Sequence, residues 1–221
     1  MKIQVEIKRN VEEKLRRRDS FKVKFDNFKV IDDSLTYKGR KLSDEVWRKR
    51  NDIVKEVSYK SVEELEELKE AENISLGVIK PKKVFDFTKT YITKVTRKWE
   101  KALLEDTQKT LEFFSEGKSY KDIRPIEHIP WKFSYRFVCD DPRCKGHNMM
   151  CEDWELLQLW RREKNDYRRD DEEAFKKVKE KYYDDFVNRK DINFVMGTES
   201  RWNQWIIIGV YYTPKHIPLP I

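Results

Sequence analysis

Four residues of the types that bind transition metals stand close together in this chain. All three cysteines and one of the three histidines fall within residues 139–151. Their spacing is Cys-x4-Cys-x2-His-x3-Cys, and the four residues are Cys139, Cys144, His147 and Cys151. Three thiolates and one imidazole form the ligand set of a closed, tetrahedral zinc site. The pattern predicts a small zinc-knuckle-like loop that holds its surroundings in place.

The spacing leaves alternatives to this knuckle open. Pro142 and Gly146 supply the turns that a metal-binding loop needs, but the spacing differs from that of the common zinc fingers. Cys151 can instead begin the next helix as a buried apolar residue. Partial or absent metal binding is therefore the competing interpretation. If all four residues bind, the full ligand shell favours a structural Zn²⁺ ion over a catalytic one.

Two carboxylates follow the cysteine-rich segment. Together with His147, Asp153 and Glu155 have the chemistry of a metal-dependent nuclease. A simpler interpretation makes Asp153 the N-cap of a helix and Glu155 an acidic residue of its first turn. The chain has only six glycines and contains no nucleophile elbow, phosphate-binding glycine loop or nuclease motif. We expect a non-catalytic protein, with the nuclease as the alternative.

Basic residues gather in several short clusters. The formal net charge is +7, which favours polyanionic partners. Arginines beside exposed aromatic rings can bind phosphates and stack on bases. Glutamate-rich runs such as residues 63–72 interrupt the clusters, so part of the charge belongs to solvated helix faces. The candidate nucleic-acid-binding residues are Arg16, Arg17, Arg18, Lys80, Lys82, Lys83, Arg161, Arg162, Arg168 and Arg169.

Five of the seven tryptophans fall into two groups. Trp99, Trp154 and Trp160 stand at helical positions typical of a core, and we expect them to pack inside. Trp202 and Trp205 flank a turn beside an apolar strand, where tryptophan can form a protein-binding patch. Packing in the core is the competing interpretation for Trp205.

Composition indicates a folded protein with a densely charged surface. Charged residues make up 40% of the 221 residues and aromatic residues 13%, whereas a disordered chain lacks such an aromatic content. Abundant Lys and Glu with little Gln are typical of hyperthermophile proteins. An odd number of cysteines excludes a complete disulfide framework and favours the reducing cytoplasm. The N-terminal residues lack the apolar stretch of a signal peptide, and the longest apolar run is too short to span a membrane.

The hydrophobic periodicity predicts an α+β fold with a mostly antiparallel sheet and flanking helices. Pro and Gly residues between 117 and 130 suggest a boundary, giving regions 1–125 and 126–221, with one compact domain as the alternative. Ser61-Val-Glu-Glu64 is a capping box that begins a helix. The expected strands are 2–8, 21–25, 131–137, 192–196 and 205–212, and the main expected helices begin at 43, 61, 93, 153 and 170.

Several of these segments resemble an uncharacterised prokaryotic family that is often found near defence genes acting on foreign nucleic acid. The resemblance rests on Leu76-Gly-Val-Ile-Lys-Pro81, Phe133-x-Tyr-x-Phe-x-Cys139, Cys144-Lys-Gly-His147, Asp153-Trp-Glu155, Gly197-Thr198 and Ile206-Ile-Ile-Gly209. It covers about two thirds of the chain and implies a defence or nucleic-acid context without an established activity. It also implies that Cys151 is not a fixed element of the pattern.

These observations together predict an accessory subunit that contacts nucleic acid without catalysing a reaction. We expect it to act in a prokaryotic antiviral complex, beside a protein partner such as a nucleic-acid-guided effector, with structural Zn²⁺ in the Cys/His loop. The first alternative is a metal-dependent nuclease that uses His147, Asp153 and Glu155. The second is a protein-interaction adaptor that binds no nucleic acid and uses Trp202.

Overall fold

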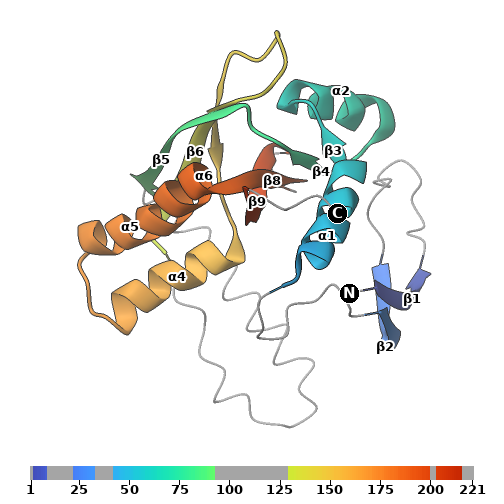
Figure 1. Ribbon diagram of the computed structural model, residues 1–221, viewed down its shortest axis with the longest axis horizontal. Helices are drawn as coiled ribbons and strands as arrows, with labels where there is room; N and C mark the ends of the chain where they lie inside the picture. The colour runs from blue at the N-terminus through green and yellow to red at the C-terminus, as the bar shows by residue number, and fades with distance from the viewer. Residues whose placement is uncertain (1, 9–21, 33–41, 93–128, 200–202, 216–221) are drawn as a thin grey trace.

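The computed structural model describes residues 2–8, 22–32, 42–92, 129–199 and 203–215 (Figure 1). The helix expected from residue 93, and Trp99 within it, lie outside these residues. The elements are β1 (Lys2–Lys8), β2 (Lys22–Asp32), α1 (Asp44–Glu56), β3 (Ser58–Tyr59), α2 (Val62–Glu72), β4 (Leu76–Ile79), β5 (Lys83–Tyr91), β6 (Trp131–Val138), β7 (His147–Met150), α4 (Trp154–Asn165), α5 (Asp171–Lys179), η2 (Glu180–Asp185), α6 (Phe186–Arg189), β8 (Lys190–Thr198) and β9 (Trp205–Pro214).

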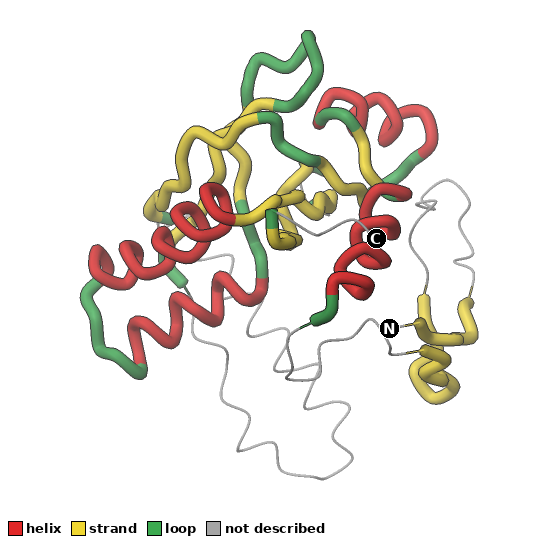
Figure 2. The backbone as a smooth tube through the Cα atoms, in the orientation of Figure 1, coloured by secondary structure: helices red, strands yellow, loops and turns green. Residues whose placement is uncertain are grey.

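The α+β class is confirmed, with helices and strands that alternate along the chain (Figure 2). The strand pairing is mostly antiparallel. One sheet has the order β3-β4-β8-β9, a second has the order β5-β6-β7, and β1 pairs with β2 as a separate two-stranded sheet. Only β3 and β4 pair in parallel among the described strands. The strand predicted at 21–25 corresponds to β2, which runs from Lys22 to Asp32, and Gly197-Thr198 lies at the end of β8.

The two larger sheets are joined at both ends. Pro81 lies in the short connection between β4 and β5 and separates the two strands, because proline cannot donate a backbone hydrogen bond to a ladder and fixes its own φ angle. At the other end Cys151 forms a parallel bridge with Ile207, and the Glu152 amide donates to the Ile207 carbonyl at 2.7 Å.

Strands from before and after residue 125 pair directly in both larger sheets. β4 pairs with β8, and β5 pairs with β6 along its whole length. The predicted boundary itself falls outside the described residues. Because each larger sheet needs strands from both predicted regions, the arrangement fits the alternative of one compact domain.

Polar side chains begin the helices where the sequence predicts. Ser43 accepts from the Val46 amide at the start of α1, and Ser61 accepts from the Glu64 amide at 3.1 Å. The carboxylate of Glu64 reaches the Lys60 amide at 2.6 Å, one residue earlier than a standard capping box would place it. These bonds satisfy amides that the first helical turn leaves without partners.

The helix α2 packs closely on strand β4. A Cβ atom added at Gly77 would lie 2.7 Å from the Leu65 side chain and 3.0 Å from the ring of Tyr59. Real Cβ contacts do not come as close as 2.7 Å, so a larger residue at position 77 would force the Leu65 side chain to move. The short distance between helix and strand fixes where the N-terminus of α2 lies.

A buried aromatic cluster forms the centre of the core. The ring of Tyr135 on β6 lies 4.7 Å from that of Phe87 on β5 and 4.8 Å from that of Phe194 on β8. Tyr182 from η2 covers this cluster, and the predicted inward positions Val178 and Phe186 are buried as well. The helices α4 and α5 lie side by side as a hairpin against these strands (Figure 1).

Asp153 links three elements at one buried carboxylate. Its Oδ1 accepts from the Leu156 amide at 3.0 Å, which caps α4, and from the Tyr182 hydroxyl at 2.9 Å. Its Oδ2 accepts from the Val210 amide of β9 at 2.8 Å. The capping interpretation of Asp153 is therefore confirmed, and the same side chain also ties α4 to η2 and β9.

The helix expected over 170–187 is present but widens into a π-helical stretch, η2. A π-helical turn shifts backbone carbonyls away from their usual partners, and the Tyr135 hydroxyl donates to the Tyr182 carbonyl at 2.7 Å. The hydrophobic spacing alone carries no sign of this widening, because the partner residue comes from a distant strand.

The apolar face expected for α1 has no buried residue. Ile53 and Val57 are about half exposed, and the Arg50 guanidinium lies over the ring of Trp47 at 5.3 Å. Among the described helices, none has the length and apolar character needed to cross a bilayer.

Replacing Asp153 by alanine should cost far more stability than replacing another helix cap. The change removes the α4 cap and leaves the buried Tyr182 hydroxyl and Val210 amide unpaired, so we expect a loss of about 3 kcal/mol or more. Asp170 caps α5 at an exposed position through the Glu172 and Glu173 amides, and Asp170→Ala should cost about 1 kcal/mol. Urea unfolding followed by circular dichroism measures both. Equal losses would contradict the linking role of Asp153.

Candidate metal centre

Four potential metal ligands meet where α2 approaches the Cys/His loop. The ligand atoms of Glu63, Cys139, Cys144 and His147 all lie within 4.8 Å of one another. Glu63 comes from the first turn of α2, Cys139 directly follows β6, Cys144 lies in the loop, and His147 begins β7. The protein therefore has a group that can bind a metal ion. Three of its members are among the four that the sequence predicts.

The distances within the group suit one small ion. Cys144 Sγ lies 3.2 Å from His147 Nε2, and His147 Nε2 lies 3.3 Å from Glu63 Oε1. A tetrahedral ion with bonds of about 2.0–2.3 Å would place its ligand atoms about 3.3–3.8 Å apart. The four side chains therefore need only small rotations to surround an ion.

Local turn chemistry shapes the loop between β6 and β7. The Arg143 amide donates to Asp141 Oδ1 at 2.9 Å, and the Cys144 amide donates to the Asp141 carbonyl at 3.0 Å. Gly146 has a φ of +96°, in a region that side chains with a Cβ rarely adopt. These features turn the chain so that Cys144 and His147 face the same point.

The loop is attached to α2 by polar contacts as well. The Ser61 hydroxyl, which caps α2, donates to Asp141 Oδ2 at 2.9 Å. The Arg143 guanidinium bonds both Asp141 and Glu67, and its hydrogen bond holds the pKa of the Asp141 carboxyl well below its usual range. Figure 1 shows the loop beside α2. The geometry of the group is thus set before any ion binds.

One buried oxygen at this site lacks a partner, and one buried thiol favours its protonated form. Burial raises the pKa of the Cys139 thiol to about 12, even though the Val62 amide at the start of α2 hydrogen-bonds to its sulfur. Glu63 Oε2 is buried and has no hydrogen-bond partner within the described part of the chain. A bound cation would replace the thiol proton and satisfy this carboxylate oxygen.

Cys151 is not part of the group, which differs from the predicted ligand set. His147 pairs with Phe137, whereas the Cys151 amide donates to the Phe133 carbonyl at 2.8 Å. Four residues of extended strand separate the two by about 13 Å. Cys151 is fully buried, and burial raises the pKa of its thiol. Cys151 is therefore a buried apolar residue and not a metal ligand, as the competing interpretation has it.

The three residues of the nuclease alternative are not brought together. His147 faces Glu63, while both oxygens of Asp153 accept hydrogen bonds from Leu156, Tyr182 and Val210. Glu155 is exposed on the first turn of α4. Among the described residues, the group around His147 contains neither Asp153 nor Glu155.

Lys80 and Lys82, on either side of Pro81, have acidic partners. Lys80 pairs with Asp191 at 2.9 Å, and Lys82 pairs with Asp140 at 2.8 Å. The Lys83 ammonium lies over the exposed ring of Phe85 at 5.2 Å. Exposed ion pairs of this kind contribute little stability, so the cations stay accessible to other anions.

The C-terminal arginines lie on and after α4. Arg161 and Arg162 line a surface hollow, Arg169 pairs with Glu163, and Arg168 adopts a left-handed backbone conformation. Arg16, Arg17 and Arg18 lie outside the described residues.

The structure separates the tryptophans differently from the sequence. Trp205 is 4% exposed and belongs to the core, which excludes it from an exposed protein-binding patch and matches the competing interpretation. Trp202 lies outside the described residues. Trp160 packs in the core as expected. The prediction for Trp154 is wrong: its side chain is 60% exposed, because its ring points away from the core from the first turn of α4.

Glu63 is the functional candidate that sequence reasoning missed. It stands in the capping-box segment, where an acidic residue also compensates the helix dipole. Because an acidic residue is expected at this position of a helix, Glu63 does not stand out in the sequence as a metal ligand. Only the pairing of distant strands shows that the start of α2 meets the Cys/His loop.

Metal analysis of purified protein should find close to one transition-metal ion per chain. Glu63→Gln, Cys144→Ser and His147→Ala should each lower the metal content and the melting temperature of the metal-loaded protein, because each removes one donor. Cys151→Ala is the matched control: it removes a thiol from the same segment and should leave the metal content unchanged. Loss of metal from the Cys151 variant with retention in the Glu63 variant would overturn this assignment.

Comparison with known proteins identifies a family but no activity. No curated protein matches the chain, and no solved structure does either. A family model described as "Domain of unknown function (DUF8757)" matches residues 57–220, about three quarters of the chain. The matched residues include all four members of the candidate metal centre. The chain therefore belongs to the DUF8757 family.

Proposed function

We propose that this protein is a non-catalytic, nucleic-acid-contacting subunit with a structural Zn²⁺ ion where α2 meets the β6–β7 loop. The observation that carries the proposal is the combination of a closed metal-ligand group with exposed cations next to exposed aromatic rings. The first feature stabilises the fold, and the second supplies contacts to a polyanion.

Zinc is the ion that best suits the donor set. Two thiolates and an imidazole favour a soft or borderline metal over Mg²⁺ or Ca²⁺, which prefer oxygen ligands. Glu63 supplies a carboxylate as the fourth donor, so no coordination position is left for water or substrate. A closed shell of this kind supports a structural role.

The position of the group also supports a structural role. It connects the start of α2 with the β6–β7 loop, and the contact between Ser61 and Asp141 already joins residues 80 positions apart. A bound ion would hold the same two segments together. Bringing such distant segments together costs chain entropy, which metal binding would offset.

Contact with nucleic acid is supported by charge and by accessible rings. The net charge is +7, and the paired lysines Lys80 and Lys82 keep more than half of their side-chain surface exposed. Phosphates can replace exposed carboxylate partners because such surface pairs are weak. Phe85 beside Lys83, and Trp154 on α4, add aromatic surface.

The role as an accessory subunit in a prokaryotic antiviral complex extends this proposal. It rests on the resemblance to a defence-associated family and on the separation of His147 from Asp153 and Glu155 among the described residues. The three free thiols fit a reducing cytoplasm. A nucleic-acid-guided effector is the partner class that would supply the chemistry.

Binding to labelled oligonucleotides should weaken steeply with salt. On single strands each phosphate contact contributes about 0.7 to the slope of log affinity against log salt concentration, so several contacts give a large loss between about 50 and 200 mM NaCl. Fluorescence anisotropy over this range measures the slope, and Lys80→Gln with Lys82→Gln should reduce it.

The same titrations contain the contrary results. Absence of binding, or binding that does not depend on salt, would refute the nucleic-acid contact. Cleavage of the oligonucleotide that requires added metal and disappears in His147→Ala would refute the non-catalytic assignment and favour a nuclease.

A further inference from the structure

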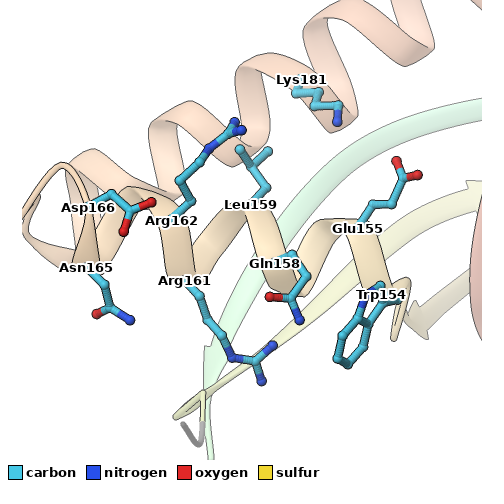
Figure 3. Close-up of a pocket in the computed structure, with 9 residues that line it drawn as sticks. All are labelled: Trp154, Glu155, Gln158, Leu159, Arg161, Arg162, Asn165, Asp166 and Lys181. Carbon is cyan, nitrogen blue, oxygen red and sulfur yellow. The ribbon is translucent and has the colours of Figure 1, made fainter. Parts of the chain in front are cut away.

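The hollow along α4 has the features of a binding site of its own (Figure 3). Its volume is about 690 Å³, which lies within the range of roughly 300–1,000 Å³ found for small-ligand sites. Residues of α4 form nearly all of its lining, and Lys181 of η2 completes it. The candidate metal centre contributes no residue to it.

One face of α4 carries an aromatic ring, two amides and a guanidinium in a row. Trp154, Gln158, Arg161 and Asn165 follow one another at spacings of four, three and four residues, so they lie on the same side of the helix. Trp154 and Arg161 are therefore about 10 Å apart along the axis. Figure 3 shows the indole ring of Trp154, the amide of Gln158 and the guanidinium of Arg161 on this side.

The fold does not account for the exposed indole. The opposite face of α4 buries Leu156, Leu159 and Trp160 against the core. Trp154 precedes all of them and is 60% exposed, although a polar residue there would expose less apolar surface to water. A large flat ring next to an amide and a guanidinium is the arrangement on which proteins stack nucleobases.

The charge of the hollow limits what it can hold. Arg161, Arg162 and Lys181 supply three positive charges, and Glu155 and Asp166 supply two negative ones. Arg162 has a long contact of 4.0 Å with Glu163. A net charge of about one suits a single phosphate between bases and does not suit a dense run of phosphates. The many charged groups, with Trp154 and Leu159 as the apolar side chains of the lining, also differ from the core of a protein-binding site.

We propose that the α4 hollow binds single-stranded nucleic acid, with one unpaired base stacked on Trp154 and an adjacent phosphate at Arg161. This inference rests on the proposed nucleic-acid contact and gives it a place and a strand preference. A base within a duplex has both faces covered by its neighbours, so it cannot stack on the indole. Gln158 lies between the two anchors, where its amide can bond a base edge.

Fluorescence anisotropy with a labelled oligothymidine and a blunt-ended duplex of equal charge tests this site. Trp154→Ala should lower affinity for the single strand about 10-fold or more, as expected from the loss of one base–aromatic stack, and should leave duplex affinity unchanged. Trp154→Phe retains a ring and should restore much of the affinity. Arg161→Gln should reduce the salt slope on the single strand by about 0.7.

The matched control is Tyr91→Ala, which removes another exposed ring, on β5 and outside the hollow. It should change single-strand affinity less than twofold. Thermal melting confirms that each variant is folded.

The outcomes separate this site from the broader proposal. If the wild type binds with a salt-dependent affinity and both Trp154→Ala and Arg161→Gln leave binding unchanged, the α4 site is refuted and the proposed function stands. If the wild type binds no oligonucleotide, both fail. Equal losses on single strand and duplex would refute the stacking and leave only a phosphate contact.

Discussion

The attachment of the β6–β7 loop to the start of α2 is the constraint on which the site depends. The Ser61 hydroxyl caps the helix and also donates to Asp141, so one side chain aligns both segments. Gly77 lets α2 approach β4 closely enough for this contact. With the two segments aligned, Glu63 on the helix faces His147 on the strand. A metal ion would then strengthen an arrangement that hydrogen bonds and packing already define.

Much of the fold follows from local rules. Ser43, Ser61, Asp153 and Asp170 begin helices because their side chains accept the amides of the first turn, and these residues are recognisable in the sequence. Alternating apolar residues locate β6, β8 and β9, because each of these strands buries one or both of its faces. The π-helical stretch was not predictable, because a hydroxyl from β6 stabilises it.

The candidate site was predictable only in part, for a similar reason. Cys139, Cys144 and His147 are close in the chain, so their spacing indicates a shared ligand. The fourth donor, Glu63, depends on a contact between segments about 80 residues apart. Cys151 has a spacing in the sequence that suits a ligand, but the extended strand β7 places it away from the other three residues. Trp154 has the periodicity of a core residue because it begins an amphipathic helix, yet it lies on the outer face.

The metal centre and the α4 hollow are close in sequence but are supported by separate interactions. Only β7 and three further residues connect His147 with Trp154. Hydrogen bonds hold the end of that connection in place. The Cys151 amide donates to Phe133 of β6, the Glu152 amide donates to Ile207 of β9, and the Asp153 carboxylate accepts three further bonds. None of these bonds involves a candidate metal ligand. Loss of an ion would therefore loosen the contact between α2 and the loop, while Asp153 would keep α4 and its exposed face in position.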